Sequence, residues 1–581
     1  ELWAFIPQEL LPHLKWYADI NYTHVAYVDL KPKVTDVRVF CGDSATGGLG
    51  SPTTCITGQP GAGIHPGGWG TILIGGMRYG GSCGACVAGS SGGVPMAVTA
   101  DFGSGSQTTR AFYSSYFVLD ITDPEQDPVL LWTFTDATLG LGTSFPAIAR
   151  VSPVADVKTD NTNAVWYAVF GSGPTGYTGS SAQKAKFFVV DIARGPTYNA
   201  DQTSGSLAGT TSATCSTSQP CVLANTTSSP VRVRAFSTGD SNAFMGDIIT
   251  LDANQDYRVD VIYAGNDIAG TTPAFVGKMY RLTTTAQSAT GTPTDLATWG
   301  IDSSGARVPT ALLANFSCST SGCTGATSVG PITMAATVSS DTTNNIWVFF
   351  GTGRFFSTAD KTNTDTQYFF GVKDDCALDS SCEQTTGPQR NNLVDVSSAA
   401  VCNPCATGTN ELAGVSVGGT AVTSVDELGS NIQSTQNLNG WFTTLPASGE
   451  RALSSPTILG GTVFFTTFVP TTDVCVAAGS GSLYALYYLT GTPYSSSTIG
   501  TSTSGGTTSI TRSIALGTGM PSQMAVQIGS QGSGTSGTGG SGSGCAGRVT
   551  GYIQASTGVL GQVCGKPALS VYSRMVSWRD L

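Results

Sequence analysis

Oxygen-bearing side chains alternate along residues 252–260, which read Asp-Ala-Asn-Gln-Asp-Tyr-Arg-Val-Asp. Asp252, Asn254, Asp256 and Asp260 occupy the first, third, fifth and ninth positions of this stretch. Such spacing brings several oxygens to one point, which suits a hard cation that takes about six to eight oxygen ligands. Only 11% of the residues in the chain are charged, yet this stretch holds three aspartates in nine positions. We predict that the loop binds one Ca²⁺ ion; the alternative is an acidic turn without a metal.

Two positions depart from the helix-loop-helix calcium motif. The sixth position, usually glycine so that the chain can turn sharply, is Tyr257, and the twelfth, usually a bidentate Glu, is Tyr263. If the backbone at Tyr257 takes a positive φ, the tyrosine costs about 1 kcal/mol. The seventh position of such loops offers a main-chain oxygen, which is the carbonyl of Arg258 here. We therefore expect a calcium loop between two strands, not an EF-hand.

The strands that position this loop belong to a repeated pattern. Short apolar strands that end in a glycine turn recur, and each is followed after a loop by a second apolar strand. A run of three or four short strands per unit is the sequence signature of a β-propeller. The first strands are expected at 71–76, 168–173, 261–265, 347–353 and 461–466, and the second at 116–120, 186–191, 278–282, 368–373 and 482–486.

The repeat is roughly 90 residues long, compared with about 40–50 in compact propeller blades. We attribute the excess to long Ser/Thr/Gly loops, which function can exploit on the faces of a propeller. The expected fold is all-β: a modified propeller in a single domain over residues 1–581, with a flexible insertion at 501–545. A pair of β-sandwiches is the alternative, but a sandwich needs no internal repeat.

At the N-terminus we expect one short helix at 8–17, followed by an opening hairpin of strands 24–29 and 36–40. The chain starts at Glu1 without an initiator Met, so we expect a processed or trimmed piece. No apolar run approaches the ~18 residues of a spanning helix. The formal net charge of −11 disfavours nucleic acid as a partner, because phosphates need a basic surface.

Most of the 15 cysteines form close pairs in polar loops. Redox chemistry would need a helix after Cys83-Gly-Ala-Cys86, which a glycine-rich loop does not provide. Zinc would need two such pairs close together, and only three histidines could assist. We therefore expect disulfides and an exported protein. The pairs are Cys41/Cys55, Cys83/Cys86, Cys215/Cys221, Cys318/Cys323, Cys376/Cys382 and Cys402/Cys405, with Cys475, Cys545 and Cys564 left over.

Six segments of the sequence are distinctive enough to compare with known families. They are Glu-Leu-Trp-Ala-Phe-Ile-Pro at 1–7, Gly-Trp-Gly-Thr-Ile-Leu-Ile-Gly-Gly at 68–76, Tyr-Phe-Val-Leu-Asp-Ile-Thr-Asp-Pro at 116–124, Phe-Gly-Thr-Gly-Arg-Phe at 350–355, Ser-Leu-Tyr-Ala-Leu at 482–486 and Ser-Trp-Arg-Asp-Leu at 577–581. On these segments the sequence resembles the C-terminal domain of the PilY family, type IV pilus assembly proteins and tip-associated adhesins. The resemblance runs from residue 1 to residue 581, with long unmatched loops between the matching segments. The family's large N-terminal region is not matched.

The resemblance implies a propeller of about seven blades and a calcium site at 252–260. Carried over residue by residue, its ligands are the side chains of Asp252, Asn254, Asp256 and Asp260 and the carbonyl of Arg258. It also implies an extracellular position at the pilus tip, minor pilins as partners, and calcium occupancy that balances pilus extension against retraction. A host or abiotic surface is a further expected partner.

Two other functions compete with this interpretation. Quinoprotein dehydrogenases are also calcium-containing propellers, but this chain lacks the adjacent cysteines that flank the quinone. His13, His24 and His65 are each better explained as structural residues, and no catalytic motif is present, so we expect no enzyme. The second alternative is a surface- or carbohydrate-binding adhesin without a role in assembly. Its candidate aromatic residues, at 441–442 and 487–488, are better explained as core.

Overall fold

The structure is a computed structural model in which β-strands dominate. The all-β prediction is confirmed. Among the residues that it describes, no helix is long and apolar enough to cross a membrane. The described residues are 3–18, 20, 26–41, 55–56, 65–81, 96–101, 105–153, 163–198, 222–223, 230–284, 293–303, 306–318, 326–377, 391–434, 438–471, 479–504, 506–528 and 549–565.

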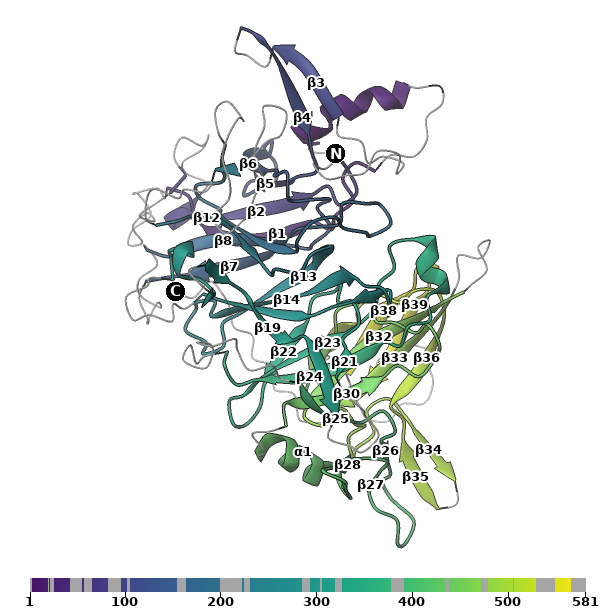
Figure 1. Cartoon of the computed structure of the whole chain (residues 1–581). Helices are drawn as coiled ribbons and strands as arrows, with labels where there is room; N and C mark the ends of the chain where they lie inside the picture. The colour runs from purple at the N-terminus through teal and green to yellow at the C-terminus, as the bar shows by residue number, and fades with distance from the viewer. Residues whose placement is uncertain are drawn as a thin grey trace, which may run out of the picture. The chain divides into compact units, whose positions relative to one another are not determined.

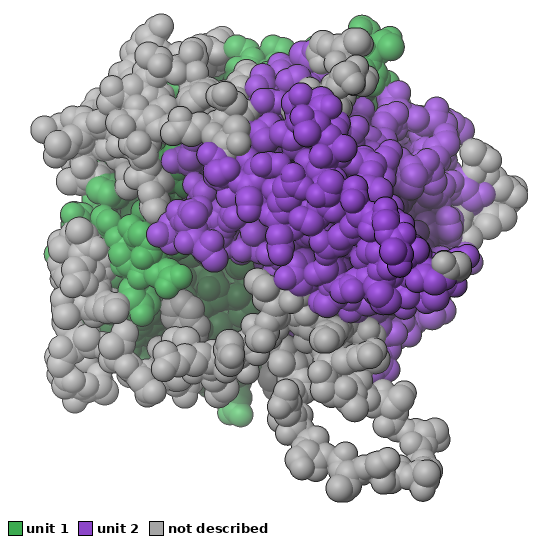
Figure 2. Space-filling view, turned by 90° about the horizontal axis from the view of Figure 1, so that it is seen from below, with its two compact units in different colours: residues 1–312, 376–388 green, residues 313–375, 389–581 purple. Residues whose placement is uncertain are grey.

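The chain packs into two compact units (Figure 2). Unit 1 comprises residues 1–312 and 376–388, and unit 2 comprises residues 313–375 and 389–581. Each unit has its own stacked sheets and its own core.

Three sheets make up most of unit 1 (Figure 1). Their strand orders are β1-β2-β5-β6, β12-β9-β8-β7 and β13-β14-β16-β19, with β15 beside β14. In the first two sheets every neighbouring pair is antiparallel. The strands are β1 (Lys33–Arg38), β2 (Trp69–Gly76), β5 (Tyr116–Asp120), β6 (Val129–Phe134), β7 (Ala147–Val151), β8 (Val165–Gly171), β9 (Lys186–Asp191), β12 (Val233–Ser237), β13 (Ala243–Leu251), β14 (Val261–Ala269), β15 (Phe275–Val276), β16 (Met279–Thr283) and β19 (Thr310–Leu313).

The middle sheet of unit 1 is buried on both faces. Successive side chains of a strand point to opposite faces. In β8 and β9, Phe170 and Phe188 join one core cluster, with strands of the first sheet. Val169 and Val189 join a second cluster, with strands of the third sheet. This stacking explains why β8 and β9 are nearly continuous apolar runs instead of alternating ones.

Unit 2 repeats this stacked arrangement. Its sheets have the orders β21-β20-β25-β30-β24-β23-β22, β31-β32-β33-β36 and β37-β38-β39. Trp347, Phe369 and Phe465 lie in the core cluster shared by the first two sheets. The strands are β20 (Asn315–Cys318), β21 (Thr327–Ser328), β22 (Thr337–Ser340), β23 (Ile346–Gly351), β24 (Tyr368–Asp374), β25 (Asn392–Asp395), β30 (Gly440–Thr444), β31 (Thr457–Leu459), β32 (Thr462–Pro470), β33 (Gly479–Tyr487), β36 (Ser513–Thr518), β37 (Ala525–Ile528), β38 (Val549–Gln554) and β39 (Leu560–Gly565).

Short hairpins and helices decorate the sheets. One α-helix, α1 (Val425–Ser434), and several 3₁₀ turns are described. The 3₁₀ turns span Gln8–Ala18, Pro66–Gly68, Leu296–Thr298 and Thr358–Thr362, and the hairpins are β3 (Met96–Asp101) with β4 (Gln107–Phe112), β10 (Thr197–Tyr198) with β11 (Val222–Leu223), β17 (Ile301–Ser303) with β18 (Ala306–Val308), β26 (Ala400–Val401) with β27 (Leu412–Ala413), β28 (Ser416–Val417) with β29 (Thr420–Ala421), and β34 (Thr501–Ser504) with β35 (Thr507–Ile510).

The opening hairpin predicted at 24–29 and 36–40 is wrong. Residues 26–29 form no strand, and β1 pairs instead with β2, so that Lys33 lies opposite Ile74. The register places Val37 in the core. The long-range pairing is favoured because it places Val37 in the core cluster that strands of the first and second sheets share.

The predicted insertion at 501–545 contains regular structure in its first part. Strands β34, β35, β36 and β37 all lie within residues 501–528. Residues 529–545 are outside the described part of the chain, so flexibility there stays a prediction.

Two predicted disulfides are present among the described residues. Cys41 is bonded to Cys55, and Cys402 to Cys405. Cys376 is also disulfide-bonded. The other predicted pairs each include a cysteine outside the described residues.

Candidate metal centre

The carboxylate-rich loop joins two strands of the third sheet of unit 1. β13 and β14 run antiparallel, and their last pair before the loop is Leu251 opposite Val261. Asp260 N donates to Leu251 O at 2.9 Å and closes the hairpin. Ile262 and Ala264, just beyond the loop, lie in the core. Core packing therefore fixes both ends of the loop.

Side-chain oxygens at the start of the loop shape its turn. Asp252 Oδ1 accepts a hydrogen bond from Asp256 N at 3.0 Å, and Asp252 Oδ2 accepts one from Tyr257 N at 2.7 Å. Asn254 Oδ1 also accepts from Asp256 N, at 3.0 Å. Gln255 and Tyr257 both have positive φ, of 60° and 66°. The sharp turn expected at the sixth position is therefore present despite the tyrosine.

Arg258 engages both carboxylate oxygens of Asp256. Its backbone N donates to Oδ1 at 3.0 Å, while Nε and Nη2 donate to Oδ2 at 2.8 and 2.5 Å. Charge-assisted bonds of this kind are stronger than neutral ones. A cation that used Asp256 would therefore share this carboxylate with a guanidinium.

Asp260 is the buried carboxylate of the loop, with 2% of its surface exposed. Its Oδ2 accepts from Ala253 N at 2.9 Å. Burial, and to a lesser extent the negative charges of Asp256 and Asp252, raise the pKa of Asp260 to about 6. A buried carboxylate with like charges around it is stabilised by a cation.

Neighbouring strands hold the second half of the loop. Val259 N donates to Arg150 O at 2.8 Å, and the Arg150 guanidinium donates to Tyr257 O. Thr284 N donates to Asp260 O at 3.0 Å. The loop is thus attached to β7 and to the end of β16 as well as to its own hairpin.

The loop carries the oxygen types that a hard cation takes, although the carboxylates of Asp252, Asp256 and Asp260 do not all lie within 4.8 Å of one another. Asp260 Oδ1 and the carbonyl oxygen of Arg258 accept no hydrogen bond from any described residue. Asp252 and Asn254 add further oxygens, and each oxygen of Asp252 accepts only one backbone N–H. Carboxylate, amide and carbonyl oxygens are the ligands that Ca²⁺ takes in proteins.

Residues 374–376 form a second group with possible ligand atoms. In Asp374, Asp375 and Cys376 these atoms lie within 4.8 Å of one another, the one such trio of His, Cys, Asp or Glu in the described part of the chain. The sulfur of Cys376 is already in a disulfide, and metal ligation by cysteine uses the thiolate. This group therefore retains two carboxylates.

A second hairpin loop, in unit 2, provides a structural comparison. It joins β22 to β23 and starts at Asp341. Asp341 Oδ1 accepts from Thr343 and from Asn345 N, and its Oδ2 accepts from Asn345 Nδ2 and from Trp347 Nε1 at 3.0 Å. These donors lower the pKa of Asp341 although burial opposes them. In this loop, N–H and O–H groups of the protein itself stabilise the Asp341 carboxylate, in the place that a cation could take.

Most of the other residues considered for chemistry are buried where the structure describes them. His65 contacts Asp120 at 3.0 Å, and its ring stacks on Phe40. His13 is buried, and His24 lies outside the described residues. The aromatic residues at 441–442 and Tyr488 are buried, as expected for core positions.

Sequence reasoning did not find the contacts of Arg150 and Thr284 with the loop. Arg150 lies 107 residues before Tyr257, and no local pattern links the two. Their roles depend on strand pairing, which brings β7 and β16 next to the hairpin.

Together these features define an all-β protein of stacked sheets that presents one carboxylate-rich hairpin loop. No protein-family model matches the chain. Two curated relatives match the chain, and each is described as a type IV pilus biogenesis factor PilY1 homolog from Xylella fastidiosa strain Temecula1. One is 24% identical over 502 residues and the other 22% identical over 500 residues, each match covering 84% of this chain.

A solved structure gives the same result for the fold. The crystal structure of the Pseudomonas aeruginosa PilY1 C-terminal domain matches with a TM-score of 0.53 and 16% identity, covering 98% of this chain and 88% of that one. The resemblance to the C-terminal domain of the PilY family is confirmed. The chain spans about a quarter of the length of the curated relatives it matches (27% and 24%).

Proposed function

We propose that the chain is a calcium-binding, non-catalytic factor of type IV pilus biogenesis. The names of the two curated relatives support the pilus role. The hairpin loop at 252–260 carries the calcium part of the proposal. Its three aspartates and one arginine give a net charge of −2, equal and opposite to that of Ca²⁺. Its ligands are the side-chain oxygens of Asp252, Asn254, Asp256 and Asp260 and the carbonyl of Arg258.

Calcium acts in this proposal by fixing the loop and the strands attached to it. An ion at the loop neutralises Asp260 and its neighbours, and it restrains the contacts to β7 and β16. Loss of the ion restores repulsion between the aspartates and loosens the β13–β14 hairpin. This change in order is the proposed switch between pilus extension and retraction.

The remaining parts of the proposal concern place and partners. The modified propeller of about seven blades is part of this proposal and is supported by the fold match to the PilY1 C-terminal domain. The described residues form six sheets of three or more strands. We place it outside the cell at the pilus tip, where it contacts minor pilins and a host or abiotic surface as a tip adhesin. Binding of purified minor pilins, compared with binding to a surface, separates the assembly role from adhesion alone.

The calcium site can be tested by melting the purified chain with calcium and with a chelator. At a free calcium concentration of 100 times the dissociation constant, binding stabilises the folded state by about 2.7 kcal/mol. Asp256→Ala and Asp260→Ala should abolish the calcium-dependent rise in Tm while leaving the fold intact, because each removes a ligand.

Asp341→Ala is the matched control. It removes an aspartate from a hairpin loop that protein donors already satisfy, so it should lower Tm but keep the calcium response. An unchanged calcium response in both Asp256→Ala and Asp260→Ala refutes the site.

A further inference from the structure

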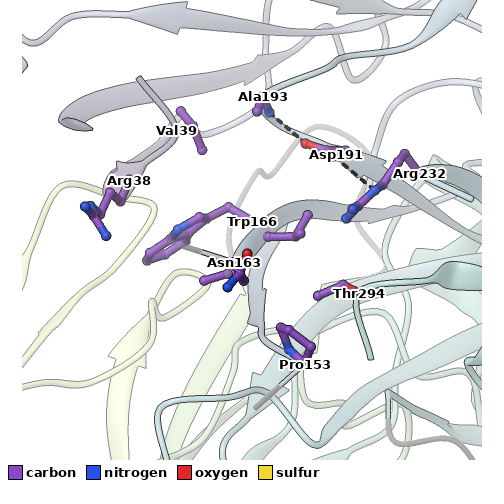
Figure 3. A pocket seen from close by; sticks show the side chains of 11 residues that line it. Arg38, Val39, Pro153, Asn163, Trp166, Asp191, Ala193, Arg232 and Thr294 are labelled. Atoms are coloured by element: carbon purple, nitrogen blue, oxygen red, sulfur yellow. Dashed lines mark hydrogen bonds and ion pairs between the residues drawn. The ribbon is translucent and has the colours of Figure 1, made fainter. Parts of the chain in front are cut away.

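A cavity of about 160 Å³ lies in unit 1, outside the calcium loop (Figure 3). It is formed where several strands of the first two sheets start or end. Arg38 ends β1, Trp166 is near the start of β8, and Asp191 ends β9. The residues that define its chemistry are Arg38, Asn163, Trp166, Asp191, Arg232 and Thr294.

Positive charge gathers around this cavity although the chain has a net charge of −11. Arg38 and Arg232 line it, and Arg194 Nε lies 3.9 Å from Asp191 Oδ2. Asp191 is the one carboxylate in the lining. It is already supported by backbone N–H groups of Ala193 and Arg194, at 2.9 and 3.3 Å. The local charge balance therefore favours an anion.

Arg232 has donors to spare. Its side chain is 12% exposed, and Nη1 donates to Tyr167 Oη at 3.2 Å. Its Nε lies 3.9 Å from Asp191 Oδ2, which is too far for a hydrogen bond. Nε is buried without an acceptor, and Nη2 donates to no described residue. A guanidinium with an unused N–H fork matches the planar geometry of a carboxylate.

The rest of the lining suits a sugar ring. Trp166 is half-buried, packs edge-on against Trp69 and lies under the guanidinium of Arg150. An aromatic surface beside hydroxyl and amide groups, here those of Thr294 and Asn163, combines apolar contact with hydrogen bonding. The volume is below the roughly 300–1,000 Å³ of pockets for drug-sized ligands, so it holds a single small ring.

We propose that this cavity binds an acidic monosaccharide, a pyranose that carries one carboxylate. The carboxylate pairs with Arg232, and the ring packs against Trp166 (Figure 3). The proposal rests neither on the calcium site nor on the proposed pilus role.

Calorimetric titration of the purified chain with sodium glucuronate tests the proposal. Glucose is the matched neutral ligand, because it has a CH₂OH group where glucuronate has the carboxylate. We expect glucuronate to bind at millimolar concentration or below. Glucose should bind the unmodified chain about tenfold or more weakly than glucuronate does, because it lacks the carboxylate. Glucuronate should bind Arg232→Met about tenfold or more weakly than the unmodified chain, because the variant lacks the guanidinium partner of the charge-assisted bond. Trp166→Leu should also weaken binding.

Arg78→Met is the control variant, because Arg78 forms an exposed ion pair with Asp29 and does not line the cavity. It should bind glucuronate like the unmodified chain. The proposal is overturned if glucuronate does not bind, if glucose binds equally well, or if glutamate binds as tightly as glucuronate. If Arg232→Met fails to fold, the comparison of glucuronate, glucose and glutamate on the unmodified chain still tests the proposal.

Discussion

At the scale of single residues, we expect Arg258 to set the calcium affinity of the proposed site. Its guanidinium donates twice to Asp256 Oδ2, and its own carbonyl oxygen is left without a hydrogen bond from the described residues. The same residue thus offers one ligand atom and a competing positive charge. At about 5 Å in water, a guanidinium and a divalent cation repel by about 1.7 kcal/mol.

Arg258→Ala should therefore bind calcium about tenfold more tightly, because the substitution removes the repulsion and frees Asp256 but keeps the backbone carbonyl. Isothermal titration of the purified chain measures this change. Arg258→Lys keeps the positive charge and should stay closer to the unmodified affinity. Weaker binding in Arg258→Ala would show that the guanidinium orients Asp256 for the ion instead of competing with it.

Tyr257 stores backbone strain at the turn. Its φ is 66° and 38% of its surface is exposed. Tyr257→Gly should stabilise the chain by about 0.5–1 kcal/mol, because glycine adopts this conformation without a steric cost. Urea unfolding in chelator measures the effect. Tyr257→Ala removes the ring but keeps the Cβ, so stabilisation of equal size in this variant would contradict the backbone explanation.

The local chemistry of the loop could be predicted from sequence, but its surroundings could not. The alternation of oxygens identified Asp252, Asn254, Asp256 and Asp260, and the missing glycine marked Tyr257 as unusual. Whether these residues bind calcium stays a prediction. The contacts from Arg150 and Thr284 arise from strand pairing, and the pairing of Arg258 with Asp256 is one of several rotamers that sequence allows.

At the scale of elements, a bulge in β13 links the loop's hairpin to the preceding sheet. The register with β14 shifts between Met245 and Ile248. The segment before β7 donates two hydrogen bonds to this bulge. Ser144 Oγ donates to Gly246 O, and Phe145 N donates to Asp247 Oδ1, each at 2.8 Å. The bulge therefore docks the second sheet of unit 1 onto the third.

Asp247 makes this junction sensitive to pH. Burial raises the pKa of Asp247 from 3.8 to about 6, although the hydrogen bond from Phe145 N opposes the change. The folded state thus keeps a proton in a window, about pH 4 to 6, where the unfolded state has lost it. The contribution of this proton on Asp247 to the free energy of unfolding is complete below about pH 4 and disappears as the pH rises through about 6.

Asp247→Asn should therefore stabilise the chain at pH 7.5, by about 1 kcal/mol after allowance for solvent screening, and have little effect near pH 4. The amide oxygen still accepts the hydrogen bond from Phe145 N. Urea midpoints at the two pH values measure the difference. Asp123→Asn, in a turn where Asp123 accepts from Glu125 N, is the control and should show no such gain. Destabilisation by Asp247→Asn at pH 7.5 contradicts the burial argument.

Strands buried on both faces were the easiest elements to predict. The expected strands 116–120 and 186–191 coincide with β5 and β9, because continuous apolar runs mark them. The helix α1 lay in a region interpreted as loop. Its signals were present: Val425, Leu428 and Ile432 recur at helical spacing and are buried, and Ser424 Oγ accepts from Glu427 N at 3.1 Å, as in a capping box.

At the scale of the whole chain, the repeated strand pattern predicted the class of fold but not the division of the chain into two compact units. The described chain forms two compact units, and nothing in the repeat distinguishes the strands of one from those of the other. The long loops hide the boundary, because residues 376–388 return to unit 1 after the chain has entered unit 2. Such a division depends on three-dimensional packing.

Hydrogen exchange with and without calcium compares the two hairpin loops within one molecule. In unit 1, calcium should slow exchange in β13, β14 and the end of β16, because Asp260 lies between Leu251 and Thr284 in their hydrogen-bond network. In unit 2, the β22–β23 hairpin should exchange equally in both conditions, because protein donors already satisfy Asp341. Asp256→Ala should remove the calcium effect in unit 1. Protection that appears equally in both hairpins would mean that calcium acts on the chain as a whole and not through residues 252–260.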